Sequence, residues 1–211
     1  MYSFKVCGDM PYCEYFPKDF DANKKYPVFF FLHGAGERGT DTEKYFVMGP
    51  LREVKCGADF PFIVVAPQCK ENTWYDHGEA FDKLFCEYLE NPFVDTSRIY
   101  LGGASMGGYG TWAFAMSHAS RLAAIVPICG GGMVWNLGTL KNLPVWAFHC
   151  EGDPVVNLGE SQRMIEALRK ITNSDVRYTV YNSRSHDAWT ETFKNPELYK
   201  WLLSKTLNKS E

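Results

Sequence analysis

The sequence predicts an α/β fold, in which helices cover both faces of a mostly parallel β-sheet. Runs that are apolar throughout, such as 26–32 and 62–66, are typical of strands buried on both faces. These runs alternate along the chain with segments of helical period, such as 79–90. Strands that alternate with helices favour a parallel sheet. We therefore expect a single α/β domain over residues 1–211, a length that allows a substantial core.

Local signals predict the elements one after another. An opening strand is expected to end at Tyr15-Phe16-Pro17, where a proline turn follows. The helical signal in 44–55 is weak because Gly49-Pro50 interrupts it, and Asn91-Pro92 stops the helix at 79–90. The remaining strands are expected at 99–101, 122–128, 144–149 and 177–181, and the remaining helices at 111–118, 158–171 and 196–207.

Composition argues against several classes of protein. A net charge of −3 without any basic run disfavours nucleic-acid binding, and no apolar run approaches the length of a membrane span. The seven cysteines are scattered without a Cys-x-x-Cys pair, so neither a disulfide framework nor a metal site is expected. The N-terminus lacks the features of a signal peptide. The chain as written is expected in the cytoplasm, although a mature secreted form recloned with a new methionine would look identical. No oligomeric state is indicated.

The stretch 99–116 has the pattern of a nucleophile elbow, a sharp turn between a strand and a helix that holds a serine at its tip. Gly103-x-Ser105-x-Gly107 stands at the turn, between an apolar run and good helix formers. A serine held in a strained tight turn brings neighbouring atoms very close, so the flanking positions must be nearly free of side chains. The alternative is a glycine-rich turn that contains a serine by chance. The flanking strand and helix favour the elbow, with Ser105 as a nucleophile.

A serine needs a general base, which is usually a histidine that a carboxylate orients. In this fold the chain order is serine, acid, histidine, and the site lies at the carboxyl ends of the strands. Among the histidines after the serine, His118 ends the elbow's own helix and is interpreted as a surface or helix-end residue. His149 is interpreted as a packed residue at a strand end. His186 lies in the polar loop after the last strand and is the expected base.

The orienting acid is expected in the loop after the preceding strand, where Glu151 and Asp153 are candidates. We favour Asp153, because the proline that follows it fixes the turn, whereas Glu151 is more easily solvated. Asp187 is too close in sequence to His186 to face its far nitrogen. Asp175 precedes the wrong strand.

An oxyanion requires two backbone N–H donors that are already in place. One should be Met106, directly after the nucleophile. The other should come from the glycine-rich loop 34–39 at the end of the first buried strand, with Ala35 as first choice and Gly36 as second. A phosphate-binding turn is the alternative for this loop. It is disfavoured because no clear helix and no helix-start lysine follow.

Several motifs together resemble one known family. The chain resembles the α/β-hydrolases, and more narrowly the carboxylesterase and predicted-peptidase group related to bacterial feruloyl and acetyl esterases. The resemblance covers nearly the whole chain and rests on 32–39, 65–69, 98–100, 105–112, 127–132 and 186–189. It implies the α/β-hydrolase fold, a triad of Ser105, Asp153 and His186, and no metal or organic cofactor. Cys150 and Asn157 depart from the family's usual glycine and proline beside the acid.

The expected reaction is hydrolysis of a small-molecule ester through an acyl-enzyme. Between 129 and 143, where cap domains commonly enter this fold, only a loop is expected. A site without a cap favours short acyl or flat aryl groups, such as acetyl or hydroxycinnamoyl, on plant polysaccharide fragments for example. Trp74, Trp135 and Trp189 are candidates to stack on the substrate, or else are structural anchors, with Trp189 the strongest candidate for an anchor. A serine peptidase on the same triad and a non-catalytic binding protein are the alternatives.

Overall fold

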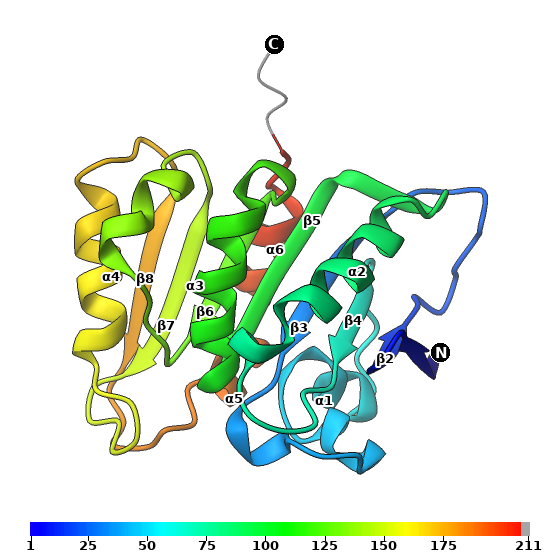
Figure 1. The fold of residues 1–211 in the computed structure, drawn as a ribbon, viewed down its shortest axis with the longest axis horizontal. Helices are drawn as coiled ribbons and strands as arrows, with labels where there is room; N and C mark the ends of the chain where they lie inside the picture. The colour runs from blue at the N-terminus through cyan, green and yellow to red at the C-terminus, as the bar shows by residue number, and fades with distance from the viewer. Residues whose placement is uncertain (208–211) are drawn as a thin grey trace.

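The computed structural model describes residues 1–207, which form one eight-stranded sheet covered by helices (Figure 1). The strand order is β1-β2-β4-β3-β5-β6-β7-β8. The pairs β1–β2 and β2–β4 are antiparallel, and all the other neighbouring pairs are parallel. The predicted α/β class is therefore confirmed. The strands are β1 Tyr2–Cys7, β2 Met10–Tyr15, β3 Tyr26–Leu32, β4 Ile63–Pro67, β5 Val94–Ala104, β6 Ala124–Ile128, β7 Val145–Cys150 and β8 Val176–Tyr181.

The helices cover both faces of this sheet (Figure 1). The α-helices are α1 Gly49–Lys55, α2 Gly78–Leu89, α3 Met106–His118, α4 Gly159–Arg169, α5 Trp189–Lys194 and α6 Pro196–Leu203. Short 3-10 helices are η1 Ala35–Glu37, η2 Thr42–Phe46, η3 Trp74–His77, η4 Ala119–Arg121 and η5 Val134–Leu140. Among residues 1–207, none of these helices combines the length and apolar character needed to cross a membrane.

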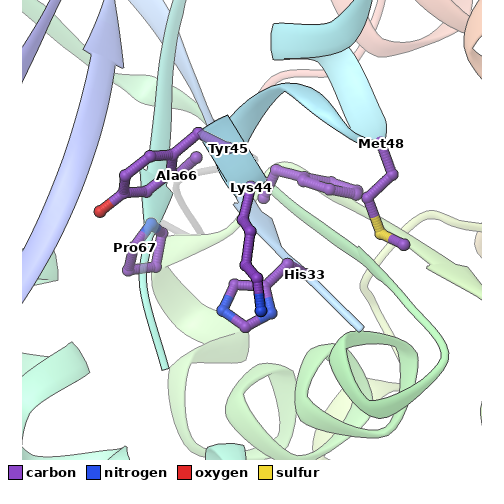
Figure 2. Close-up of a pocket in the computed structure, with 7 residues that line it drawn as sticks. His33, Lys44, Tyr45, Met48, Ala66 and Pro67 are labelled. Carbon is purple, nitrogen blue, oxygen red and sulfur yellow. The ribbon is translucent and has the colours of Figure 1, made fainter. Parts of the chain in front are cut away.

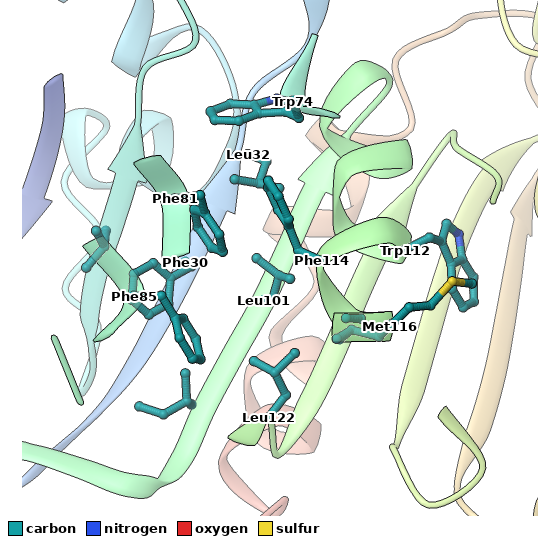
Figure 3. Packing of buried hydrophobic residues seen from close by; sticks show 14 of the residues in the cluster. Phe30, Leu32, Trp74, Phe81, Phe85, Leu101, Trp112, Phe114, Met116 and Leu122 are labelled. Carbon is teal, nitrogen blue, oxygen red and sulfur yellow. The ribbon is translucent and has the colours of Figure 1, made fainter. Parts of the chain in front are cut away.

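The all-apolar strands explain why there are two core layers. In β3, Phe30 and Leu32 join the cluster under α2, α3 and α4, part of which Figure 3 shows, whereas Phe29 and Phe31 join the cluster under α1, α5 and α6. Successive side chains of a strand point to opposite faces, so a strand covered on both sides needs apolar residues at every position. Burial of these large side chains contributes roughly 1.5–3 kcal/mol each.

Three local expectations were wrong. The opening strand is a hairpin of β1 and β2, because Gly8 adopts φ +57° and closes a tight turn. The Gly49-Pro50 pair begins α1 rather than interrupting a helix, since a proline in the first turn gives up no helical hydrogen bond. The expected last helix ends at Leu203, and an unpredicted short helix, α5, precedes it.

The carboxyl ends of β3, β5, β6, β7 and β8 meet at one edge of the sheet, the lower edge in Figure 1. The loops that leave these ends carry the candidate residues: the glycine-rich loop, the serine turn, and the loops with Asp153 and His186. Ligands in sheets of this kind bind at this edge. The fold thus brings together side chains that are far apart in the sequence.

Candidate active site

Ser105 stands at the tip of a turn between β5 and α3, with a positive φ of 56°. The glycines around it have no room for a side chain. A Cβ on Gly107 would lie 1.9 Å from the carbonyl oxygen of Leu32, and one on Gly103 would lie 2.4 Å from the carbonyl oxygen of Gly107. Both obstacles are backbone atoms, which cannot rotate away. The glycine pattern therefore follows from the tight approach of α3 to the end of β3.

The structure brings Ser105, His186 and Asp153 into one hydrogen-bonded chain. His186 Nε2 lies 2.8 Å from Ser105 Oγ, and His186 Nδ1 lies 2.7 Å from Asp153 Oδ2. The other carboxylate oxygen of Asp153 accepts hydrogen bonds from the backbone N–H groups of Val155 and Val156, at 2.8 and 3.0 Å. The serine loop, the histidine loop and the acid loop (residues 151–157) therefore meet at these contacts.

The environment of Asp153 sets the tautomer of His186. Burial alone would raise the pKa of this fully buried carboxyl. The hydrogen bonds from His186 and from the backbone of Val156 and Val155 outweigh burial, and the pKa lies below its usual value. An ionised Asp153 only accepts hydrogen bonds, so Nδ1 of His186 carries the hydrogen. Nε2 is then free to accept the hydroxyl proton of Ser105.

The predicted oxyanion donors, the backbone N–H groups of Met106 and Ala35, lie at the starts of two helices. Met106 is the first residue of α3, so its N–H has no partner within the helix, and the helix dipole favours negative charge at this end. Ala35 is exposed and opens the short helix η1 directly after β3. Gly36 is exposed too, and nothing within 4 Å would obstruct a side chain there.

The sequence analysis did not indicate His33 as a functional residue, yet its side chain is hydrogen-bonded to the backbone of the glycine-rich loop 34–39. Its Nε2 accepts a hydrogen bond from the backbone of Cys69 at 3.0 Å, so Nδ1 carries the hydrogen and donates to the carbonyl of Gly34 at 2.7 Å. Burial lowers the pKa of His33 to about 4, which keeps it neutral. The adjacent cavity, which Lys44 and Met48 also line, holds only about 10 Å³ and is too small for a substrate (Figure 2). A histidine directly before a strand-end glycine is the signal that could have indicated this role.

The three tryptophans have different places. Trp74 was expected either to stack on the substrate or to be a structural anchor, and the stacking alternative was wrong, because its side chain is completely buried in the cluster shown in Figure 3. Its indole N–H donates to the carbonyl of His33 at 2.9 Å. An indole can be buried when its N–H finds such a partner. Trp135 is 84% exposed on η5. Trp189 is partly buried and packs edge-on against the His186 ring, with centroids 5.2 Å apart.

The residues set aside in the sequence lie outside the hydrogen-bonded chain. Glu151 is exposed, and His118 lies at the far end of α3, with Nε2 3.0 Å from Asp82. Asp187 accepts a hydrogen bond from the backbone N–H of Thr190, in the first turn of α5, at 2.9 Å. Asp175 precedes β8 and pairs with basic side chains there, namely Arg177 and Lys205.

Cys129 is a further residue that the sequence did not indicate. It follows β6 with an unusual φ of +48°, and its Sγ donates to the carbonyl of His186 at 3.4 Å. Ligating atoms of Cys129, Asp153 and His186 lie within 4.8 Å of one another, a donor set that a metal ion could use. However, burial raises the pKa of the thiol, and the carboxylate and imidazole are bound to each other. We assign no metal to this set. The position of Cys129 directly after a predicted strand is the sequence signal that could have indicated it.

Comparison with known proteins places this geometry in a family. The profile of the phospholipase/carboxylesterase family matches residues 59–200. The chain belongs to the phospholipase/carboxylesterase family. It has the α/β-hydrolase fold, and the resemblance stated from the sequence motifs is confirmed.

Relatives of this family member include esterases and peptidases. "Probable feruloyl esterase C" of Aspergillus terreus is 26% identical over 144 residues, which are 66% of this chain and 53% of that protein. "Dipeptidyl-peptidase 5" of Porphyromonas gingivalis is 32% identical over 135 residues, 57% of this chain and 19% of that protein. The chain therefore spans about half or less of the length of these curated relatives.

Solved structures resemble the chain over almost its whole length. A thermostable esterase superposes with a TM-score of 0.83 and 32% identity, covering 98% of this chain and 63% of that one. A feruloyl esterase module from Clostridium thermocellum, solved with sinapinate, has a TM-score of 0.72 at 18% identity, covering 96% and 86%. The second likeness shows a shared fold alone.

Proposed function

We propose that this family member is a serine carboxylesterase that hydrolyses short-chain acyl or aryl esters. The observation that carries the proposal is the contact of Ser105 Oγ with His186 Nε2 at 2.8 Å, with the ionised Asp153 behind the ring. An activated serine needs this arrangement of nucleophile, base and orienting acid. Family membership supports an ester bond as the target.

In the proposed reaction, His186 takes the proton of Ser105 as the hydroxyl attacks the ester carbonyl. The N–H groups of Met106 and Ala35 stabilise the resulting oxyanion, a contribution typically worth about 10²–10³-fold in kcat per donor. His186 then protonates the leaving alcohol, and water hydrolyses the acyl-enzyme by the same steps in reverse. No metal or organic cofactor takes part in these steps.

The short segment between β6 and β7 supports small or flat acyl groups. Between β6 and β7 the chain forms only a loop with η5, and no cap covers the serine from this segment. A long alkyl chain would have no enclosed apolar surface to bury against. Exposed Trp135 and the partly buried Trp189 beside His186 are the remaining candidates to stack on an aryl ring or a sugar.

A serine peptidase on the same triad is a second candidate, because curated relatives include dipeptidyl-peptidases 5. Ester and amide substrates would use the same serine, so labelling cannot separate the two. A panel with nitrophenyl esters, one feruloyl ester and one peptide amide separates them. Cleavage of the peptide at a higher kcat/KM than that of every ester would reverse the assignment.

The triad is tested with a fluorophosphonate probe, which modifies activated serines covalently. We expect labelling at Ser105, and loss of both labelling and turnover in Ser105→Ala. His186→Ala should also lose several orders of magnitude in kcat, and the double variant should be little worse, since the residues act as a unit. Asp153→Asn should cost roughly 10²–10⁴-fold. A damaging Glu151→Gln beside a nearly silent Asp153→Asn would show that the acid is misassigned.

Acyl preference is tested by the rates for nitrophenyl esters of increasing chain length. We expect a maximum between acetyl and butyryl esters and a steep fall by octanoyl, because an alkyl chain beyond the open site gains little burial. A kcat/KM that keeps rising toward long acyl chains would require an apolar channel and would refute the short-chain proposal.

A further inference from the structure

His149 lies near the end of β7, is completely buried and takes no part in the proposed reaction steps. Its Nε2 faces two oxygens of the acid loop, the carbonyl of Val156 at 3.0 Å and Oδ2 of Asp153 at 3.4 Å. A carbonyl and an ionised carboxylate only accept hydrogen bonds. Nε2 must therefore carry a hydrogen, which it directs at the acid loop.

The other side of the ring is held equally firmly. Nδ1 lies 2.7 Å from Ser161 Oγ on α4, and this hydroxyl also lies 2.7 Å from the carbonyl of Gly130. Burial lowers the pKa of His149, so the ring is neutral and Nδ1 accepts the single hydrogen of the Ser161 hydroxyl, for which the carbonyl of Gly130 is the competing acceptor. Gly130 in turn packs on Gly108 of the elbow, where a Cβ on Gly130 would lie 2.5 Å from the carbonyl carbon of Gly108. One ring thus joins the acid loop to α4.

The orientation of the Asp153 carboxylate depends on the backbone conformation of the acid loop. Oδ1 is held by the N–H groups of Val155 and Val156, so the carboxylate turns with the backbone of these residues. Nε2 of His149 fixes the carbonyl of Val156. The same N–H also favours the position of Oδ2 that faces Nδ1 of His186. Misplacement of a catalytic group by about 1 Å can cost about 10²-fold in rate.

We propose that His149 is a positioning residue for the Ser105–His186–Asp153 triad, and that it acts only through Asp153. The inference rests on the proposed function, because it assigns His149 to the support of that triad. If His149 acts only through Asp153, substitutions at residue 149 should no longer change kcat once Asp153 cannot serve as the orienting carboxylate.

The test is a double-mutant cycle with a short-chain nitrophenyl ester as substrate. His149→Phe keeps a ring of similar size without its nitrogens, and we expect kcat to fall about tenfold with KM unchanged, which corresponds to about 1.4 kcal/mol. In an Asp153→Asn background the same substitution should change kcat less than about twofold, since interacting residues are not additive. His149→Gln, whose amide can reach the acid loop, should recover most of the rate. His118→Phe, a histidine substitution outside the site, is the matched control.

Ser161→Ala provides a second variant if His149→Phe does not fold. It frees the ring from α4, and we expect kcat to fall about threefold in the wild-type background and not at all with Asp153→Asn. An equal loss in both backgrounds, or no loss beyond that of His118→Phe, overturns the inference. Fluorophosphonate labelling of Ser105 and the large effect of Asp153→Asn would then still support the proposed function. A silent Asp153→Asn would instead show that the acid is misassigned, and it would overturn the inference as well.

Discussion

The stability of the protein at acid pH should depend on His33, the residue directly before the glycine-rich loop 34–39. It is buried, and its two nitrogens are used by the backbone of Cys69 and Gly34. Burial, as the largest cause, lowers its pKa from the ordinary value of 6.5 to about 4. Acidification therefore affects the two states differently at this residue. Below about pH 6.5 the unfolded chain binds a proton at His33, whereas the folded chain does not until about pH 4.

The loss of stability follows from these two pKa values. Stability from neutral His33 is fully present above pH 6.5 and is lost as the pH falls toward 4, because the unfolded state binds more protons there. The expected loss is about 2 kcal/mol at pH 5 and about 3 kcal/mol at pH 4. For a domain whose whole stability is roughly 5–15 kcal/mol, this is a large change.

Urea denaturation of the wild type and of His33→Gln, at about pH 7 and about pH 5, measures this loss. Glutamine does not titrate, and its amide oxygen can accept the Cys69 N–H. The variant should be less stable at neutral pH, and the gap should shrink by about 2 kcal/mol at pH 5. Burial also lowers the pKa of His149, but that residue is present in both proteins and cancels. An equal pH dependence in the two proteins would refute the reasoning.

The remaining predictions concern two matched pairs of substitutions. Gly107→Ala should lower the melting temperature and abolish ester hydrolysis, because its Cβ would lie 1.9 Å from the carbonyl oxygen of Leu32 in β3. Gly36→Ala, whose Cβ would have no atom within 4 Å, should melt like the wild type. Equal melting temperatures would contradict the elbow geometry. Trp74→Phe should lower the free energy of unfolding by about 1–3 kcal/mol, since the His33 carbonyl loses its donor. Exposed Trp135→Ala should change it by less than about 0.5 kcal/mol and instead raise KM for aryl esters. An unchanged KM for aryl esters would remove Trp135 from the substrate site.

The order of the elements could be read from the sequence because it depends on short-range patterns. All-apolar runs such as 26–32 can only be buried on both faces, and a parallel sheet covered by helices is the arrangement that buries them. The same logic selected Ser105, Asp153 and His186. Strands that run parallel end at one edge, so chain order and strand ends were sufficient to expect these side chains near one another.

Only the tertiary structure decided which neighbours each side chain has. Trp74 was ambiguous in the sequence, since an indole in a loop can be exposed or buried. In the structure it is buried, and the carbonyl of His33 accepts its N–H. His149 read only as a packed residue, because its partners Val156 and Ser161 come from two later segments. Hydrogen-bond partners of buried polar groups are set by distances across the fold. Local sequence determines which groups need a partner, and the packing of distant segments determines which partner they find.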